Sequence, residues 1–436
     1  MNIIFFVIIL ISFIFAGWNQ IYGGPFTVET LPMQVMSKAM VDSATNAVTL
    51  AIGLTGVMAL FLGLMKVAEE GGLLKIIAWL IRPLMVRLFP DVPPDSPAMG
   101  AMILNMSANA LGLGNAATPF GIRAMQELDK LNQQKGTATN AMALFLTINT
   151  AGITLLPTTV IALRASAGSA NPAGILSTTL FASICATVIA ILAAKIFQRF
   201  SQVETTSSQT MNTEEQLNTS SNQNEPDTGL LQEGDKGYPL WASALALGLL
   251  AAMIPLTVIY GSVVSPWVLP FLMLGFLTFG VIRRVRIYEV FVEGAKEGFQ
   301  VAVRIIPFLV AILVAVGMFQ ASGAMAVMVS ALGRWTSMFG LPAEALPMAL
   351  MRPLSGSGSY GILASVINNP AIGPDSYTGY LVSTFMGSSE TTFYVLAVYF
   401  GAVQVRRVRH TLAAALTADA AGILFSIIAC KYFLMG

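Results

Sequence analysis

The chain has 436 residues, of which 55% are hydrophobic and only 10% are charged, and its net charge is +1. Soluble globular proteins carry roughly 25% charged residues, so this composition excludes an ordinary soluble domain and indicates a membrane protein. No basic cluster is large enough to bind a duplex, and we expect no nucleic-acid partner.

Apolar runs that suit membrane spans recur along the chain. A spanning helix needs about 20 mostly apolar residues. The runs are 3–16, 47–65, 139–163, 173–197, 239–261, 265–282, 302–319 and 411–434. Residues 3–16 lack the basic start of a signal peptide, so we interpret them as a retained first helix. The predicted fold class is an all-α polytopic membrane protein, with the lipid bilayer as its surroundings.

One segment departs from this composition. Residues 201–237 are rich in Ser, Thr, Asn, Gln and Glu. They contain too few large apolar side chains to offset the entropy of ordering the chain. We predict a disordered polar linker between two membrane domains, 1–200 and 238–436.

The two halves read as diverged copies at an offset of 250 residues. Each begins with an amphipathic helix, 31–46 or 287–300, and continues into a span, a glycine-containing break and a short helix. Lys and Arg favour the cytoplasmic side. The loop at 66–75 is basic whereas 320–324 carries no charge. We therefore predict two inverted repeats, with Arg406–Arg409 in the cytoplasm.

Tracts of small polar residues interrupt the apolar sequence at matched places, 104–121 and 350–361, and a third lies at 385–394. Polar side chains alternate in the first two tracts. Residues i and i+2 point about 200° apart on a helix, so this pattern favours an extended or unwound segment. Broken helices survive at membrane depth when they line a polar cavity. The alternative is that small residues only allow close helix packing.

We predict that these tracts, and a second broken span in each half at 143–163 and 381–400, converge on one solute site. The candidate substrate-binding residues are Asn105, Ser107, Asn109, Asn115, Thr118, Asn149, Thr150, Ser355, Ser357, Ser359, Ser388, Ser389, Glu390 and Thr391.

Glu390 is the acidic residue of the second broken span. An ionisable group within a span is a functional-site hypothesis by default. It could bind a coupling ion, sodium or a proton, or accept hydrogen bonds from a solute; the alternative is an internal ion pair with Arg352. Asp419 is a weaker candidate. His410, the one histidine, is expected at a solvated headgroup position.

No enzyme signature is present in the sequence: it has no phosphate-binding loop, no HExxH and no metal-ligand cluster. We therefore expect no catalytic residue, no metal and no cofactor. Cys185 and Cys430 each lie in an apolar span and are expected to be buried free thiols.

The long motifs resemble two known families. NMSANALGLGNAATPFGIRAM at 105–125 and NTAGITLLPTTVIALR at 149–164 resemble the spore maturation protein A family. YEVFVEGAKEGFQVAVRIIPFLVAILVAVGMFQASGAM at 288–325, with GPDSYTGYLVSTFMGSSETTFYVLAVYFGAV at 373–403, resembles the spore maturation protein B family. These families are usually separate chains, and here they look fused. Both resemble the nucleoside-recognition or gate superfamily, which includes concentrative nucleoside transporters. That resemblance implies two re-entrant hairpins and two unwound helices around a central solute site.

We expect a multi-pass protein of the bacterial cytoplasmic (inner) membrane. The expected function is secondary transport of a small polar metabolite of the nucleoside, amino acid or carboxylate class, since no nucleotide-binding machinery is present. The alternative is a gate-fold scaffold or sensor that binds a solute or partner without moving it. Either function is compatible with a homo-oligomer.

Overall fold

The computed structural model describes residues 2–23, 31–201 and 269–434, together with single positions 241, 248 and 267. Within these ranges the chain is helical, and its β structure is one isolated bridge between Thr137 and Arg407. The predicted all-α fold class is confirmed. Nearly all of the predicted linker 201–237 and of the predicted span 239–261 lies outside the described residues.

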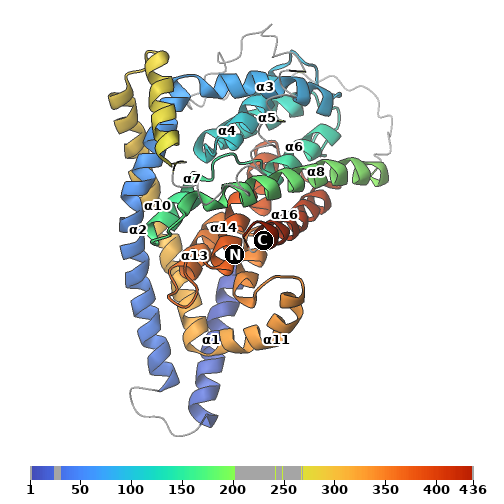
Figure 1. Cartoon of the computed structure of the whole chain (residues 1–436). Coiled ribbons are helices and arrows are strands. Elements are labelled where there is room, and N and C mark those ends of the chain that lie inside the picture. Colours follow the sequence, from blue (N-terminus) through green and yellow to red (C-terminus); the bar gives the residue numbers. More distant parts are fainter. Residues whose placement is uncertain are drawn as a thin grey trace, which may run out of the picture.

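The helices of the two halves follow the same order (Figure 1). The first half contains α1 (Asn2–Tyr22), α2 (Pro32–Glu70), α3 (Leu73–Leu88), α4 (Pro97–Ala110), α5 (Gly114–Lys130), α6 (Asn140–Ala151), α7 (Thr158–Ser166), η2 (Pro172–Ile175) and α8 (Leu176–Phe200). The second half contains a helix at Leu269–Ile282, α10 (Ile287–Ala321), α11 (Ala324–Met338), η4 (Ala343–Ala345), α12 (Leu346–Met351), α13 (Gly356–Ile367), α14 (Tyr377–Ser388), α15 (Thr392–Ala402) and α16 (Thr411–Leu434). In each half a long helix, a short helix, a helical pair, a broken helix and a final long helix follow one another, as diverged copies would. The inverted repeat itself stays a prediction.

Several helices are long and apolar enough to cross a bilayer. In the described part of the chain these are α1, α2, α16 and the continuous η2–α8 segment, and the bent pair α10–α11 makes a fifth. Large apolar side chains on them are exposed, for example Ile52 on α2, Leu192 on α8 and Leu424 on α16. Such side chains suit a lipid surface rather than water. The chain is a multi-pass membrane protein.

Each predicted amphipathic helix continues into its span as a single helix. Helix α2 runs without a break through 31–46 and 47–65. Likewise α10 joins 287–300 to 302–319. The predicted breaks at 69–72 and 321–323 are present, and α10 turns by 76° into α11.

Helices α2 and α10 pack antiparallel along one side of the molecule (Figure 1). Glycines allow this close approach: a Cβ atom on Gly294 would lie 2.6 Å from the carbonyl oxygen of Leu62, and one on Gly298 would lie 2.7 Å from the Cα atom of Ala59. Because these neighbours are backbone atoms, they cannot rotate away. The contact joins the two halves.

Gly298→Leu is therefore expected to destabilise the protein by at least about 1–3 kcal/mol, the usual cost of overpacking. Gly56→Leu is the matched control, because Gly56 is an exposed glycine of α2, and no atom of the described residues lies within 4 Å of a Cβ built on it. Thermal unfolding of both variants in detergent measures the difference. Equal melting temperatures would contradict the packing described here.

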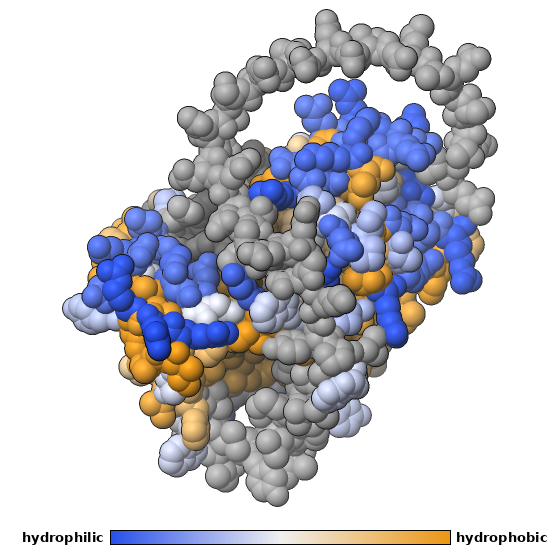
Figure 2. Space-filling model, turned by 90° about the horizontal axis from the view of Figure 1, so that it is seen from above, coloured by the Kyte–Doolittle hydropathy of each residue, from blue (hydrophilic) through white to orange (hydrophobic). Residues whose placement is uncertain are grey.

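The basic segment 406–410 contacts the first half. The N–H groups of Arg406 and Arg407 donate to the carbonyl oxygen of Gly136 at 2.9 and 3.0 Å. Arg409 Nη1 donates to the carbonyl oxygen of Ala138 at 3.0 Å. Figure 2 shows hydrophilic residues gathered at the end of the molecule where α3 lies. His410, however, is only 7% exposed, so its predicted solvated position is wrong. The chain turns at Arg409, with φ 51°, and His410 enters the packed start of α16.

Burial, and then the charge of Arg409, lower the pKa of His410 from its ordinary value of 6.5. The folded state thus favours the neutral imidazole. This contribution to stability is fully present above about pH 6.5 and is lost as the pH falls below that value. We expect the melting temperature to fall more steeply between about pH 7.5 and about pH 5.5 in the wild type than in His410→Gln. Parallel pH profiles would show that His410 does not titrate with unfolding.

Candidate functional site

Four interruptions of helical structure occur at corresponding places in the two halves. Two are the tips of helical pairs, at 111–113 between α4 and α5 and at 352–355 between α12 and α13. The other two are breaks within apolar segments, at 152–157 between α6 and α7 and at 389–391 between α14 and α15. Both broken spans are thus where the sequence predicts them.

A backbone hydrogen bond joins the tip and the break within each half. In the first half, Leu155 N donates to the carbonyl oxygen of Ala110 at 2.8 Å. In the second half, Phe393 N donates to the carbonyl oxygen of Pro353 at 3.0 Å. Gly112 has φ +76°, and a Cβ atom there would lie 2.5 Å from a carbonyl oxygen of the neighbouring break. Only glycine fits this tip.

The breaks of the two halves also contact each other. Glu390 N donates to the carbonyl oxygen of Thr150 at 2.9 Å. A Cβ atom on Gly387, at the end of α14, would lie 3.1 Å from the Cβ atom of Pro157. These contacts bring residues about half the chain length apart to one crossing.

A cavity of about 920 Å³ lies at this crossing. Its lining includes the N-cap residues of α5, α7, α13 and α15, which are Leu113, Pro157, Ser355 and Thr391. A helix N-terminus carries a partial positive charge and N–H groups without intrahelical partners. The cavity therefore lies at the N-terminal ends of four helices, where the partial positive charge favours electronegative groups of a polar solute.

Charged side chains line the same cavity. Lys66 Nζ lies 3.5 Å from Glu69 Oε2 on α2 and 4.0 Å from Glu297 Oε1 on α10. Arg352 and Glu390 line it as well. Lys66, Glu69 and Glu297 were not predicted as site residues, since the first two resemble a loop in the sequence and Glu297 the polar face of a helix. The available signal was that Lys66 and Glu69 lie near the end of the long apolar helix α2.

Five of the predicted site residues line the cavity: Asn109, Ser355, Ser357, Glu390 and Thr391. Asn109 donates through Nδ2 to Asn149 Oδ1 at 2.8 Å, which positions its amide. Ser355 Oγ caps α13 by accepting from Gly358 N at 3.0 Å. The side chain of Glu390 is 48% exposed.

The alternating residues of the first tract do not share one face. Asn105, Ser107 and Asn109 lie within α4, so the predicted extended segment is wrong here. Asn105 is buried, and its Nδ2 donates to the carbonyl oxygen of Ala117 at 2.7 Å and to Tyr399 Oη at 3.1 Å. Ser107 donates to a carbonyl one turn earlier in its own helix. The helical rotation turns Ser107 away from Asn109, whereas Asn105 lies one turn before Asn109 on the same face and is held by Ala117 and Tyr399 outside the cavity lining.

The second tract behaves in the same way. Ser355 ends the interruption with extended backbone, whereas Ser357 and Ser359 lie within α13. Ser359 is buried and donates to the carbonyl oxygen of Ser355 at 2.7 Å. The cavity lining includes Ser357 and leaves out Ser359.

Four more predicted residues lie close to the breaks without lining the cavity. Asn149, Thr150 and Ser389 each donate to a backbone carbonyl of the preceding turn. Ser388 Oγ lies 3.4 Å from Ser426 Oγ on α16. Thr118 lies half-buried within α5, and the side chain of Asn115 lies outside the described residues.

Arg352 holds the second break in place. It is 6% exposed, and its Nη1 donates to Thr391 Oγ1 at 3.0 Å. Its Nη2 donates to the carbonyl oxygen of Ser389 and lies 3.8 Å from Glu390 Oε2. The ion pair considered for Glu390 is therefore present, yet Glu390 also faces the cavity. Asp419 accepts from Thr392 Oγ1 at 2.7 Å and does not line the main cavity.

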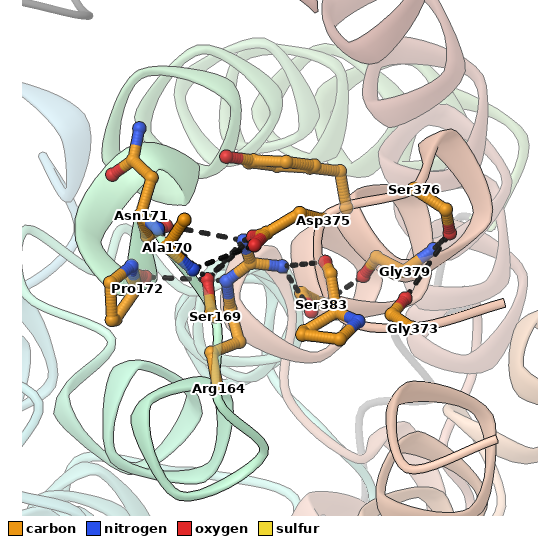
Figure 3. A network of polar contacts seen from close by, with 12 residues as sticks. Arg164, Ser169, Ala170, Asn171, Pro172, Gly373, Asp375, Ser376, Gly379 and Ser383 are labelled. Carbon is orange, nitrogen blue, oxygen red and sulfur yellow. Dashed lines mark hydrogen bonds and ion pairs between the residues drawn. The ribbon is translucent and has the colours of Figure 1, made fainter. Parts of the chain in front are cut away.

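A second network, not predicted from the sequence, joins the halves at the other end of α7 (Figure 3). Arg164 is fully buried and lies 2.9 Å from Asp375 Oδ1. Its Nη1 donates to the carbonyl oxygen of Pro374 at 2.6 Å, and its guanidinium stacks on the Tyr380 ring at 4.1 Å. Asp375 also accepts from Ser169 Oγ and from Ala170 N. Arg164 was not predicted as part of a network, because an arginine at the end of an apolar span usually anchors the helix at the membrane surface.

Comparison with known proteins places the chain in a family. The family model described as "Gate: Nucleoside recognition" matches residues 51–167 and 302–406, which together are about half of the chain. Spore maturation protein A of Bacillus subtilis (strain 168) is 41% identical over 196 residues, which cover 45% of this chain and 94% of that protein. Spore maturation protein B of the same organism is 44% identical over 160 residues, which cover 37% of this chain and 89% of that protein. The chain therefore belongs to the Gate nucleoside-recognition family, and its similarity to both spore maturation proteins A and B is consistent with a fusion of the two.

Proposed function

We propose that this protein is a secondary transporter of a small polar metabolite in a bacterial cytoplasmic membrane. The observation that carries the proposal is the single cavity at the crossing of two broken helices, one from each half. Transporters built from two repeats hold their solute between discontinuous helices near the middle of the bilayer. A cavity of about 920 Å³ is within the size range of small-molecule sites.

The lining supports a nucleoside before an amino acid or a carboxylate. Met386, Phe393 and Tyr394 provide apolar and aromatic surface, which suits a flat heterocycle. Asn109 and Ser357, with the nearby Glu390, provide hydrogen-bonding groups for hydroxyls and ring nitrogens. The description of the matching family supports the same class.

Uptake of labelled solutes into proteoliposomes tests the proposal. The panel contains nucleosides, amino acids and small carboxylates, and protein-free liposomes are the control. Saturable uptake of one class is the expected result. Saturable binding without uptake would favour the scaffold or sensor instead, and neither binding nor uptake across the panel would contradict a solute site.

Ser357→Ala is expected to weaken solute binding by about tenfold, because one hydrogen bond contributes about 0.5–1.5 kcal/mol. Asn109→Ala should do the same from the other half of the protein. Ser359→Ala is the matched control, because Ser359 lies two residues further along the same helix and donates within it. Equilibrium binding to the purified variants measures the effect. A loss of affinity in Ser359→Ala as large as that in Ser357→Ala would remove the assignment.

A further inference from the structure

The break between α14 and α15 gathers oxygen atoms around one positive charge. The carbonyl oxygen of Ser389, the hydroxyl of Thr391 and the carboxylate of Glu390 all contact the Arg352 guanidinium. Asp419, on α16, adds a further attraction to that guanidinium. Carbonyl, hydroxyl and carboxylate oxygens at an unwound helix are the ligands that hard cations prefer.

These oxygen atoms balance the charge of Arg352, but they do not accept hydrogen bonds from all of its N–H groups. Nη1 and Nη2 have acceptors, whereas the buried Nε has no hydrogen-bond partner among the residues that the structure describes. Arg164, the other deeply buried arginine described above, differs: its Nε, Nη1 and Nη2 all donate to oxygen atoms. A site shaped for guanidinium normally uses its planar fork of donors. The surroundings of Arg352 are closer to those of a compact cation.

There is also room for an ion beside this side chain. A second, small cavity of about 10 Å³ is lined by Arg352, Ser388, Ser389 and Asp419, among others. That is about the space of one water molecule. Removing the guanidinium would extend this space into the oxygen set, so that a small cation could occupy it.

We propose that the Arg352 guanidinium occupies a built-in monovalent-cation site, where it takes the place of a bound sodium ion and holds the second break together. The wild-type protein therefore binds no sodium ion at this position. Arg352→Ala opens the position to a free monovalent cation. A further consequence, that uptake needs no sodium gradient through this site, rests on the proposed transport function, whereas the occupancy itself does not.

Thermal unfolding of the purified full chain tests the occupancy without any transport assay. Wild type, Arg352→Ala and Arg352→Lys are measured in sodium, potassium or choline chloride at one ionic strength, and then with guanidinium chloride at low millimolar concentration. Arg82→Ala is the matched control, because Arg82 pairs with Asp95, whose side chain is 77% exposed. The expected result is a saturable, sodium-specific rise of about 2–4 °C in Arg352→Ala. A similar rise from dilute guanidinium in that variant is also expected, whereas wild type, Arg352→Lys and Arg82→Ala should not respond.

Sodium-specific stabilisation of the wild type would overturn the proposal. So would a folded Arg352→Ala that is indifferent to both cations. If Arg352→Ala does not fold in any of these salts, Arg352→Lys decides: folded Arg352→Lys shows that a tethered positive charge is what the site requires. An Arg352→Lys that also fails to fold shows that the guanidinium shape is required and contradicts the proposal. None of these outcomes depends on whether the protein moves a solute.

Discussion

Arg164→Ala is expected to prevent the recovery of folded protein from the membrane, or to lower its stability by about 3–5 kcal/mol. Arg164 is fully buried, and it donates to the carbonyl oxygens of Pro172, Asn171 and Pro374 as well as to Asp375. Asp375 is 39% exposed, so the ion pair alone contributes little of this loss. Most of it comes from carbonyl oxygens left without donors and from the space that the side chain fills.

The control for this prediction is Arg82→Ala. Arg82 Nη2 lies 2.8 Å from Asp95 Oδ1, but Asp95 is 77% exposed, so the pair should contribute no more than about 1 kcal/mol. Size-exclusion chromatography and thermal unfolding in detergent compare the two variants. If Arg164→Ala behaves like Arg82→Ala, the network of Figure 3 does not hold the halves together.

Glu390→Gln is expected to reduce solute affinity by about 10–100-fold while the protein still inserts and remains monodisperse. The Glu390 side chain is 48% exposed and lines the cavity, and its backbone N–H donates to the carbonyl oxygen of Thr150. A hydrogen bond to a charged group contributes about 1.5–3 kcal/mol. Glutamine keeps the shape of the side chain but loses the negative charge, so the change isolates the electrostatic part of recognition.

Glu344→Gln is the matched control, because Glu344 is an exposed carboxylate of η4 that does not line the cavity. Both variants are titrated with the solute that the panel identifies. If Glu390 also couples transport to a proton, Glu390→Gln will change the pH dependence of uptake. Unchanged affinity in Glu390→Gln would limit this carboxylate to its ion pair with Arg352.

Much of the fold could be predicted from the sequence because lipid imposes strong constraints. Long apolar runs had to be helices, since backbone groups in hydrocarbon must bond within their own segment. Glycines at 71–72 and 323, and the polar breaks near 152 and 390, marked real interruptions. The segments 31–46 and 47–65 form one helix, because a change in polarity does not stop a helix when the backbone can continue.

The candidate site was predictable only in outline. The breaks and Glu390 were visible, because polar residues inside apolar runs are costly without partners. The depth and partners of each side chain were not visible: Asn109 lines the cavity, whereas Asn105, one turn earlier on the same helix, is buried against Tyr399. Lys66, Glu297 and Arg164 were also missed as site or network residues, since their partners lie in distant segments of the chain.

The most direct test of the central claim is solute protection of one cysteine from each half. Asn109→Cys and Ser357→Cys are made separately in a chain whose Cys185 and Cys430 are replaced by serine, with Ser330→Cys on the exposed face of α11 as the control. Alkylation by N-ethylmaleimide in membranes is followed as the solute concentration rises. We predict that the same solute protects both cavity cysteines with the same half-maximal concentration and leaves the control unprotected. Protection of one cavity cysteine alone, or at clearly different concentrations, would contradict a single solute site shared by the two halves.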